Sequence, residues 1–149
     1  MGTIRVMNTL REPPCPLCDT RSDTVLWRSA QARVLRVDDP AWPGFCRVVW
    51  NTHVAEMTDL APAERRYLME LVFGVENALR RVLSPAKINL ASLGNQVPHL
   101  HWHVIPRFAD DAAFPDAIWA PARRGGAPRT VDWVALETAV RHELESLGA

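Results

Sequence analysis

Residues 98–106 read Pro98-His99-Leu100-His101-Trp102-His103-Val104-Ile105-Pro106, so three of the five histidines of the chain alternate with apolar side chains. Successive side chains of a β-strand point to opposite faces, and this spacing therefore puts His99, His101 and His103 on one face. An α-helix would distribute the same imidazoles around its axis at about 100° per residue. The pattern predicts a half-buried strand, with an apolar face on a core and a row of imidazoles on its accessible face.

A row of three imidazoles is compatible with three interpretations. It can be a histidine-rich surface strand without chemistry. It can be a metal site, because a His-x-His pair on a strand binds zinc through two ring nitrogens. It can also supply a nucleophilic histidine whose neighbours set its tautomer and bind phosphate oxygens. The residues on either side of the row distinguish these interpretations.

The row resembles the signature of the histidine triad (HIT) family of nucleotide hydrolases and transferases, in which three histidines alternate with apolar residues. The preceding residues are similar to that family's phosphate-binding approach to the triad and read Asn89-Leu90-Ala91-Ser92-Leu93-Gly94-Asn95-Gln96-Val97. The resemblance extends from about Cys15 to Pro106. It implies an antiparallel sheet, a nucleotide substrate and a homodimer, since members of the family commonly dimerise.

Length and composition predict one globular domain. The 149 residues are 48% hydrophobic, enough for a domain over 1–149 with a core at about 15–108 and a C-terminal loop and helix at 109–149. The 17 basic and 17 acidic residues give a formal net charge of zero, so the overall charge does not favour nucleic acid or an anionic membrane as a partner. No apolar run approaches the ~20 residues of a membrane span, and residues 1–14 lack the apolar core of a signal peptide. We therefore expect a cytoplasmic protein with no nucleic acid and no membrane as a partner.

The rest of the chain predicts an α+β fold, an antiparallel β-sheet meander with one long helix and a C-terminal helix. Further strands are expected where short alternating or apolar runs occur, at 24–27, 32–37, 45–50 and 87–93. Apolar residues recur at helical spacing between 62 and 83, and Pro62 suits the first turn of that helix. The second helix is expected at 131–147. The long helix should cover one face of the sheet.

Two cysteines, Cys15 and Cys18, lie three positions apart near the start of the chain. In a cytoplasmic protein such a pair is more typical of a metal knuckle or a redox pair than of a structural disulfide. A redox pair needs a helix N-terminus directly after the motif, whereas residues 19–23 are typical of a loop. A metal site needs two further ligands.

Members of the family that the chain resembles, and the related galactose-1-phosphate uridylyltransferases, often hold a zinc ion with such a cysteine pair and two histidines. The resemblance therefore implies a closed, tetrahedral zinc site of structural type. Its ligands would be Cys15, Cys18, His53 and His99. The alternative for His53 is a loop histidine that binds no metal. No organic cofactor is implied.

The resemblance also implies a catalytic set of His99, His101 and His103. His101 would attack the α-phosphorus of a nucleotide through a neutral ring nitrogen, and water would hydrolyse the nucleotidyl-imidazole intermediate. The opposite ring nitrogen must keep its proton, through a hydrogen bond to a backbone carbonyl, so that the attacking nitrogen carries the lone pair. Positioned donors must meet the charge on the phosphoryl oxygens, because such transfer depends on placement and electrostatics.

The expected donors are His103 and the amides of Asn95 and Gln96, while Asn89 would contact phosphate or ribose from the preceding strand. Relatives typically carry Gly-Gln-Ser/Thr-Val before the first histidine of the triad, whereas this chain has Gly-Asn-Gln-Val at 94–97. An amide donates to a phosphoryl oxygen but does not relay a proton as a hydroxyl does. The departure bears on rate and leaving-group preference more than on binding.

A ribose contact is expected at the end of the strand at 32–37. In relatives an acidic or amide residue at this place binds the ribose hydroxyls, and Asp38 fits it, with Asp39 as the alternative. The Asp38 carboxylate could instead form an Asx-turn beside Pro40.

The residues and the resemblance together predict a nucleotide phosphohydrolase or nucleotidyl transferase. It would cleave a phosphoanhydride or phosphoramidate at the α-phosphate through a histidine-nucleotidyl intermediate, and diadenosine polyphosphates are the first substrates to test. One alternative is a nucleotide-binding or sensing protein with negligible turnover. Another is a zinc-dependent hydrolase that uses the triad histidines as metal ligands.

Overall fold

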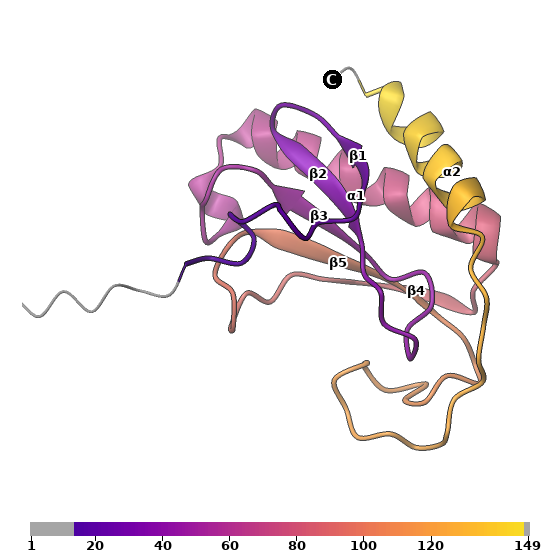
Figure 1. Cartoon of the computed structure of the whole chain (residues 1–149). Helices are drawn as coiled ribbons and strands as arrows, with labels where there is room; N and C mark the ends of the chain where they lie inside the picture. Colours follow the sequence, from indigo (N-terminus) through magenta and orange to yellow (C-terminus); the bar gives the residue numbers. More distant parts are fainter. Residues whose placement is uncertain (1–13, 148–149) are drawn as a thin grey trace, which may run out of the picture.

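The computed structural model describes residues 14–147 and has a five-stranded antiparallel sheet with two α-helices packed on it (Figure 1). The α+β fold expected from the sequence is therefore confirmed. The strands are β1 (Val25–Arg28), β2 (Ala32–Arg36), β3 (Cys46–Trp50), β4 (Lys87–Ala91) and β5 (His101–Arg107). The helices are the short 3₁₀ helix η1 (Met57–Asp59), α1 (Pro62–Leu83) and α2 (Trp133–Glu145).

The elements lie close to their expected bounds. Helix α1 has the bounds predicted for it, and Ser84, with a φ of 46°, ends it in the left-handed conformation. Strand β5 begins at His101 rather than 99, because the N–H of His99 bonds to the carbonyl of Val97 in a tight turn before the strand. Strand β4 and helix α2 are slightly shorter than predicted. None of the described helices combines the length and the apolar character that crossing a membrane requires.

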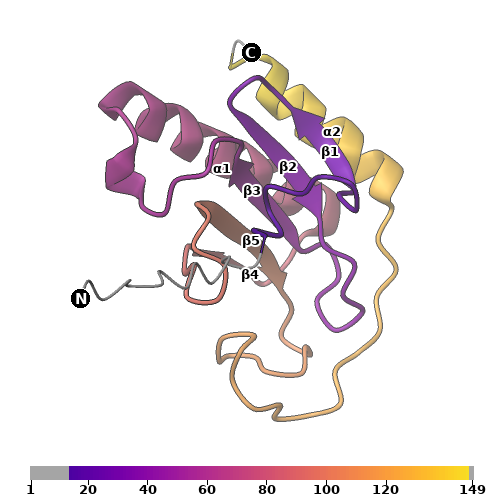
Figure 2. The same ribbon diagram turned by 60° about the vertical axis from the view of Figure 1, so that its left-hand side comes forward.

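The strand order is β1-β2-β3-β5-β4, and every neighbouring pair is antiparallel (Figure 2). Strand β5, which carries two of the triad histidines, therefore lies inside the sheet between β3 and β4. In this register Val49 lies opposite His101, and Arg47 lies opposite His103. Directly opposite residues share a face of the sheet, so these four side chains belong to the same face.

The other face of the sheet carries the hydrophobic core. Val34, Val48 and Val104 are fully buried there, in one cluster with residues of α1 and α2. Gly74 of α1 allows α2 to pack closely, because a Cβ atom at this position would overlap the side chain of Leu144. The helices therefore leave the face with the histidines to other parts of the chain.

The face with the histidines is polar but not accessible. His99 is fully buried, and His101 and His103 are each only 7% exposed. The expected row of accessible imidazoles is therefore wrong. Burial arises because Leu17 from the N-terminal segment, the turn before β5 and Trp119 from the connection to α2 lie over this face.

A buried ion pair attaches the β5–α2 connection to the sheet. Arg107 donates to the Asp111 carboxylate through Nε and Nη2 at 2.8 and 2.9 Å, and through Nη1 to Oδ1 of Asn89 at 2.8 Å. Three backbone N–H groups also donate to this carboxylate. Burial opposes the charged form of Asp111, but Arg107 and the backbone donors hold the pKa of its carboxyl below the usual value.

Replacing Arg107 by Met should lower the free energy of unfolding by about 3–5 kcal/mol, because the substitution leaves the Asp111 carboxylate buried without its cation. Urea denaturation followed by circular dichroism measures this loss. The matched control is Arg123→Met, which removes an exposed ion pair with Asp116 and should leave the midpoint almost unchanged. Equal effects of the two substitutions would contradict a structural role for Arg107.

Candidate functional site

The polar face of the sheet holds a cavity of about 490 Å³. His101 and His103 line it from β5, Arg47 lines it from β3, and Asn95 and Gln96 line it from the turn before β5. Four of these five residues are the ones expected to act at phosphate, so the structure brings them together. Arg47 was not expected there.

A hydrogen bond to the backbone fixes the tautomer of His101. Its Nδ1 lies 2.6 Å from the carbonyl oxygen of His99, and because a carbonyl only accepts, Nδ1 carries the proton. The lone pair is then on Nε2, which bonds to no residue that the structure describes. This is the arrangement predicted for a nucleophilic imidazole.

Both cavity imidazoles are held in the neutral form. Burial lowers the pKa of His101, against the opposing effect of its backbone hydrogen bond, and the positive charge of Arg47 lowers it further. Burial, followed by the effects of His101 and Arg47, lowers the pKa of His103 to about 4. The two ring centroids are 4.9 Å apart with the rings nearly perpendicular. The pair therefore offers ring nitrogens with free lone pairs at neutral pH.

The turn that precedes β5 positions the two amides of the cavity. Ser92 donates its hydroxyl to the carbonyl of His101 at 2.8 Å, which ties the turn to the strand. Gly94 has a φ of +72°, a conformation that side chains with a Cβ rarely adopt, so the chain can reverse here. Asn95 and Gln96 follow, exposed at the mouth of the cavity.

An aromatic side chain borders the cavity from the β5–α2 connection. Trp119 is 53% exposed, and its ring lies edge-on to that of His103 with 5.4 Å between centroids. Two arginines of the same connection are engaged within it: Arg123 pairs with Asp116, and Arg124 donates to backbone carbonyls. Trp119 is therefore the part of this connection that reaches the site.

Two residues expected to bind nucleotide lie away from this cavity. The Asn89 side chain accepts from Arg107 and lines a separate hollow at the edge strand β4. Asp38 pairs with Arg36 and lines another hollow, near α2. Asp39, the alternative to Asp38, accepts from the N–H of Ala41 in an Asx-turn. The structure does not bring these residues to His101.

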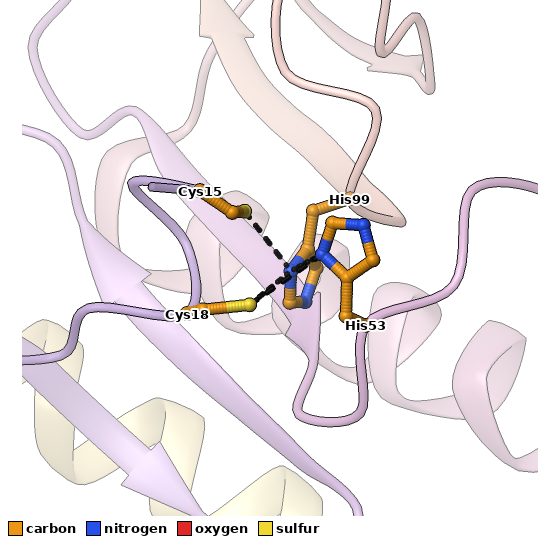
Figure 3. A group of neighbouring side chains, drawn as sticks. All are labelled: Cys15, Cys18, His53 and His99. Atoms are coloured by element: carbon orange, nitrogen blue, oxygen red, sulfur yellow. Dashed lines mark hydrogen bonds between the residues drawn. The ribbon is translucent and has the colours of Figure 1, made fainter. Parts of the chain in front are cut away.

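Four side chains from three parts of the chain form a group that could hold a metal ion (Figure 3). Cys15 and Cys18 come from the segment before β1, His53 from the loop after β3 and His99 from the turn before β5. The Nδ1 atoms of the two histidines are 3.2 Å apart. Sγ of Cys18 lies 3.4 Å from Nδ1 of His53 and 3.5 Å from that of His99, and Sγ of Cys15 lies 3.5 Å from Nδ1 of His99. The candidate ligand atoms lie within 4.8 Å of one another, as a single ion requires.

The orientation of His99 suits this group. Its Nε2 lies 2.6 Å from the carbonyl oxygen of Trp50, which leaves Nδ1 directed at the cysteines and His53. A backbone acceptor on the far nitrogen is the usual support of a metal-binding histidine. His99 therefore belongs to this group, and in the described part of the chain the three triad histidines do not form a metal group of their own.

Arg47 is the site residue that the sequence analysis missed. It lies on β3 directly opposite His103 and reaches the cavity beside the histidine pair. The sequence carries one signal of it, a single charged residue in the middle of the apolar run 45–50. Its relevance follows only from the pairing of β3 with β5.

Comparisons with known proteins identify the family to which the chain belongs. The model of the HIT domain family matches residues 20–110, more than half of the chain, and the chain belongs to this family. A solved histidine triad protein from Bradyrhizobium japonicum is 27% identical, with a TM-score of 0.67, over 82% of this chain and 90% of that one. Another from Marinobacter aquaeolei is 26% identical, with a TM-score of 0.67, over 85% and 91%.

Among curated proteins, the chain is similar to a bis(5'-nucleosyl)-tetraphosphatase (asymmetrical) of Schizosaccharomyces pombe. The two are 30% identical over 86 residues, which are 54% of this chain and 47% of the relative. The match thus spans about half the length of this relative.

The low pKa of His103 predicts how its ring titrates and how it affects stability at acidic pH. At about pH 5.5 its ring should still be neutral, because the folded-state pKa is about 4 against 6.5 for an unperturbed histidine. The unfolded chain then binds the proton at a higher pH than the folded chain, so this residue should reduce stability as the pH falls from 6.5 towards 4. Ring-nitrogen NMR spectra recorded across this range, with His103→Gln to assign the signal, measure the titration. A midpoint near 6.5 would contradict the shift.

Proposed function

We propose that this chain is a nucleotide hydrolase or nucleotidyl transferase that acts at an α-phosphate through a covalent intermediate on His101. Membership of the HIT domain family and the similarity to a tetraphosphatase support a nucleotide hydrolase. The observation that carries the proposal is the 2.6 Å hydrogen bond from Nδ1 of His101 to the carbonyl of His99. It leaves Nε2 as a neutral nucleophile in a cavity of nucleotide-binding size.

The reaction proceeds in two displacements. Nε2 of His101 forms a bond to the α-phosphorus while the bond to the leaving group breaks, and the leaving group departs with the electron pair. The ring is then positively charged, and the His99 carbonyl stabilises it by accepting from Nδ1. Water next attacks phosphorus and loses a proton to solvent, the N–P bond breaks with its electron pair returning to Nε2, and a nucleoside monophosphate is released with His101 neutral again. His103, Asn95 and Gln96 meet the charge on the phosphoryl oxygens.

Diadenosine polyphosphates are the substrate class that we propose first. The support is the printed activity of the fission-yeast relative, a tetraphosphatase of bis-nucleosyl substrates. A substrate with a phosphoramidate bond is compatible with the same two displacements. Asn89 and Asp38, which lie outside the cavity, have no part in this mechanism.

A second candidate is a nucleotide sensor that binds its ligand with negligible turnover. It is favoured by one observation, the amide of Gln96 where relatives typically have a hydroxyl, since an amide relays no proton to a leaving group. Trapping of the intermediate distinguishes the two candidates.

Mixing the protein with diadenosine tetraphosphate should produce a nucleotidyl adduct on His101, detectable by intact mass and peptide mapping, together with free nucleoside monophosphate. His101→Ala should abolish the adduct and lower kcat at least about 10³-fold, because the nucleophile is lost. The matched control is His142→Ala, an exposed histidine of α2 that should behave as wild type. Binding without adduct or product would favour the sensor.

We further propose that Cys15, Cys18, His53 and His99 hold a zinc ion. With Zn–S near 2.3 Å and Zn–N near 2.0–2.1 Å, a tetrahedral site separates sulfur from nitrogen by about 3.6 Å and two nitrogens by about 3.4 Å. The separations of 3.4–3.5 Å and 3.2 Å are close to these values. Four protein ligands leave no open position, so zinc would have a structural role and hold the N-terminal segment against His99.

Protein purified without added metal should contain about one equivalent of zinc by elemental analysis, as expected for a closed four-ligand site. Cys18→Ser should reduce this to below about a tenth of an equivalent and lower the melting temperature. Cys46→Ala is the matched control, because this buried cysteine lies outside the group and should leave the zinc content unchanged. Wild-type protein with less than about a tenth of an equivalent would contradict the proposal.

We also propose that the protein forms a homodimer and is located in the cytoplasm, as the sequence predicts. In the described part of the chain β4 is an edge strand that pairs on one side only, with β5. Such an edge can pair with a strand of a second copy.

A further inference from the structure

Besides the exposed Arg28 at the sheet's edge, three arginines lie on the polar face of the sheet, and two of these three have a carboxylate partner. Arg33 pairs with Asp23 at 2.8 Å, and Arg107 pairs with Asp111 at 2.8 Å, each pair being almost fully buried. Arg47 makes no ion pair with any residue that the structure describes. Since its neighbours on this face are paired, Arg47 differs from them in having its charge available.

Two unsatisfied nitrogens mark the position of Arg47. Over residues 14–147, the buried side-chain atoms without a hydrogen-bond partner are Nε of Arg47 and Nδ1 of His103. These two residues lie directly opposite each other on β3 and β5. A buried polar atom without a partner is costly, and a guanidinium keeps its charge even when burial lowers its pKa. A bound ligand could supply the hydrogen-bond partners that these two nitrogens lack.

Charge specifies the kind of ligand. Among the described residues that line the cavity, Arg47 is the only arginine or lysine, and none is an aspartate or glutamate. Under the mechanism above, the α-phosphate already has donors in His103 and the two amides. A substrate with further phosphates brings additional negative charge, and the guanidinium fork is the available group that matches phosphate oxygens.

The pairing of β3 with β5 places Arg47 relative to the phosphate that His101 attacks. Val49 is opposite His101, whereas Arg47 is opposite His103, one step further along β5 on the same face. Diagonal neighbours in a sheet lie about 7–8 Å apart at Cα, within reach of a long side chain. The guanidinium can therefore contact a phosphate adjacent to the one that His101 attacks.

We propose that Arg47 is a specificity-determining residue that binds a second substrate phosphate, so that the cavity prefers polyphosphates to substrates whose leaving group is uncharged. This inference rests on the proposed function. It assigns the selection between phosphoanhydride and phosphoramidate substrates to one residue of β3.

The test compares two substrates that both release AMP, diadenosine tetraphosphate and adenosine 5'-phosphoramidate. Arg47→Met should lower the ratio of their kcat/KM values by about 10- to 100-fold, as expected for one or two charge-assisted hydrogen bonds. Arg47→Lys, which keeps the charge but not the fork, should restore part of the ratio. Arg66→Met, an exposed arginine of α1, is the matched control and should leave the ratio unchanged. Equal losses for both substrates, or an unchanged ratio in Arg47→Met, would overturn the inference.

A binding measurement separates this inference from the proposed function. Calorimetric titration with ADP and AMP requires no turnover, and Arg47→Met should weaken ADP binding about 10-fold more than AMP binding. If wild type turns over neither substrate but shows this difference, the proposed function fails and the role of Arg47 stands. If turnover is observed and Arg47→Met binds ADP and AMP as wild type does, the role of Arg47 fails alone.

Stability provides a further readout that a merely structural arginine would not give. Arg47→Met removes a half-buried charge that has no carboxylate partner among the described residues, so its melting temperature should equal or exceed that of wild type. Arg33→Met should melt at a lower temperature, because it leaves the Asp23 carboxylate buried without its cation. Misfolding of Arg47→Met would contradict the inference, since it would mean that Arg47 supports the fold.

Discussion

The site depends on one hydrogen bond, from Nδ1 of His101 to the backbone carbonyl of His99. The acceptor residue, His99, is fixed by contacts of both of its ring nitrogens. The ring of His99 bonds through Nε2 to the carbonyl of Trp50 at the end of β3, and through Nδ1 it faces the cysteines and His53. The first histidine of the triad thus acts as a fixed support, and the second presents its lone pair because of that support.

The two faces of the sheet have different roles: one carries the hydrophobic core and the other carries the polar site. Apolar residues on one face pack against α1 and α2 and stabilise the domain. On the opposite face, arginines and histidines are buried under loops, where each needs a partner. Arg33 and Arg107 have carboxylate partners, whereas Nε of Arg47 and Nδ1 of His103 have no hydrogen-bond partner among residues 14–147. The unpaired position coincides with the cavity, as expected where binding rather than stability sets the residue.

The sequence predicted the elements well, because their patterns are local. Alternation at 98–106 and helical spacing at 62–83 are properties of neighbouring residues, and the cysteine–histidine group followed from a resemblance carried by short motifs. Burial of the imidazoles was not predictable, because the covering segments come from distant parts of the chain. Arg47 was missed for the same reason, since its partner is set by cross-strand register. Asp38 and Asn89 were expected at the cavity, but their side chains are engaged by Arg36 and Arg107.

The contact between Cys15 and His99 joins residues 84 positions apart and has a consequence for the order of folding. Contacts of long sequence separation form late, because closing a large loop costs entropy before it is rewarded. The adjacent strands β4 and β5 can pair early, whereas the N-terminal segment must dock afterwards. A nascent or partly unfolded chain can therefore have His101 and His103 on a formed strand while it lacks the wall that Pro16 and Leu17 contribute to the cavity. Catalytic competence would then report the last step of folding rather than the first.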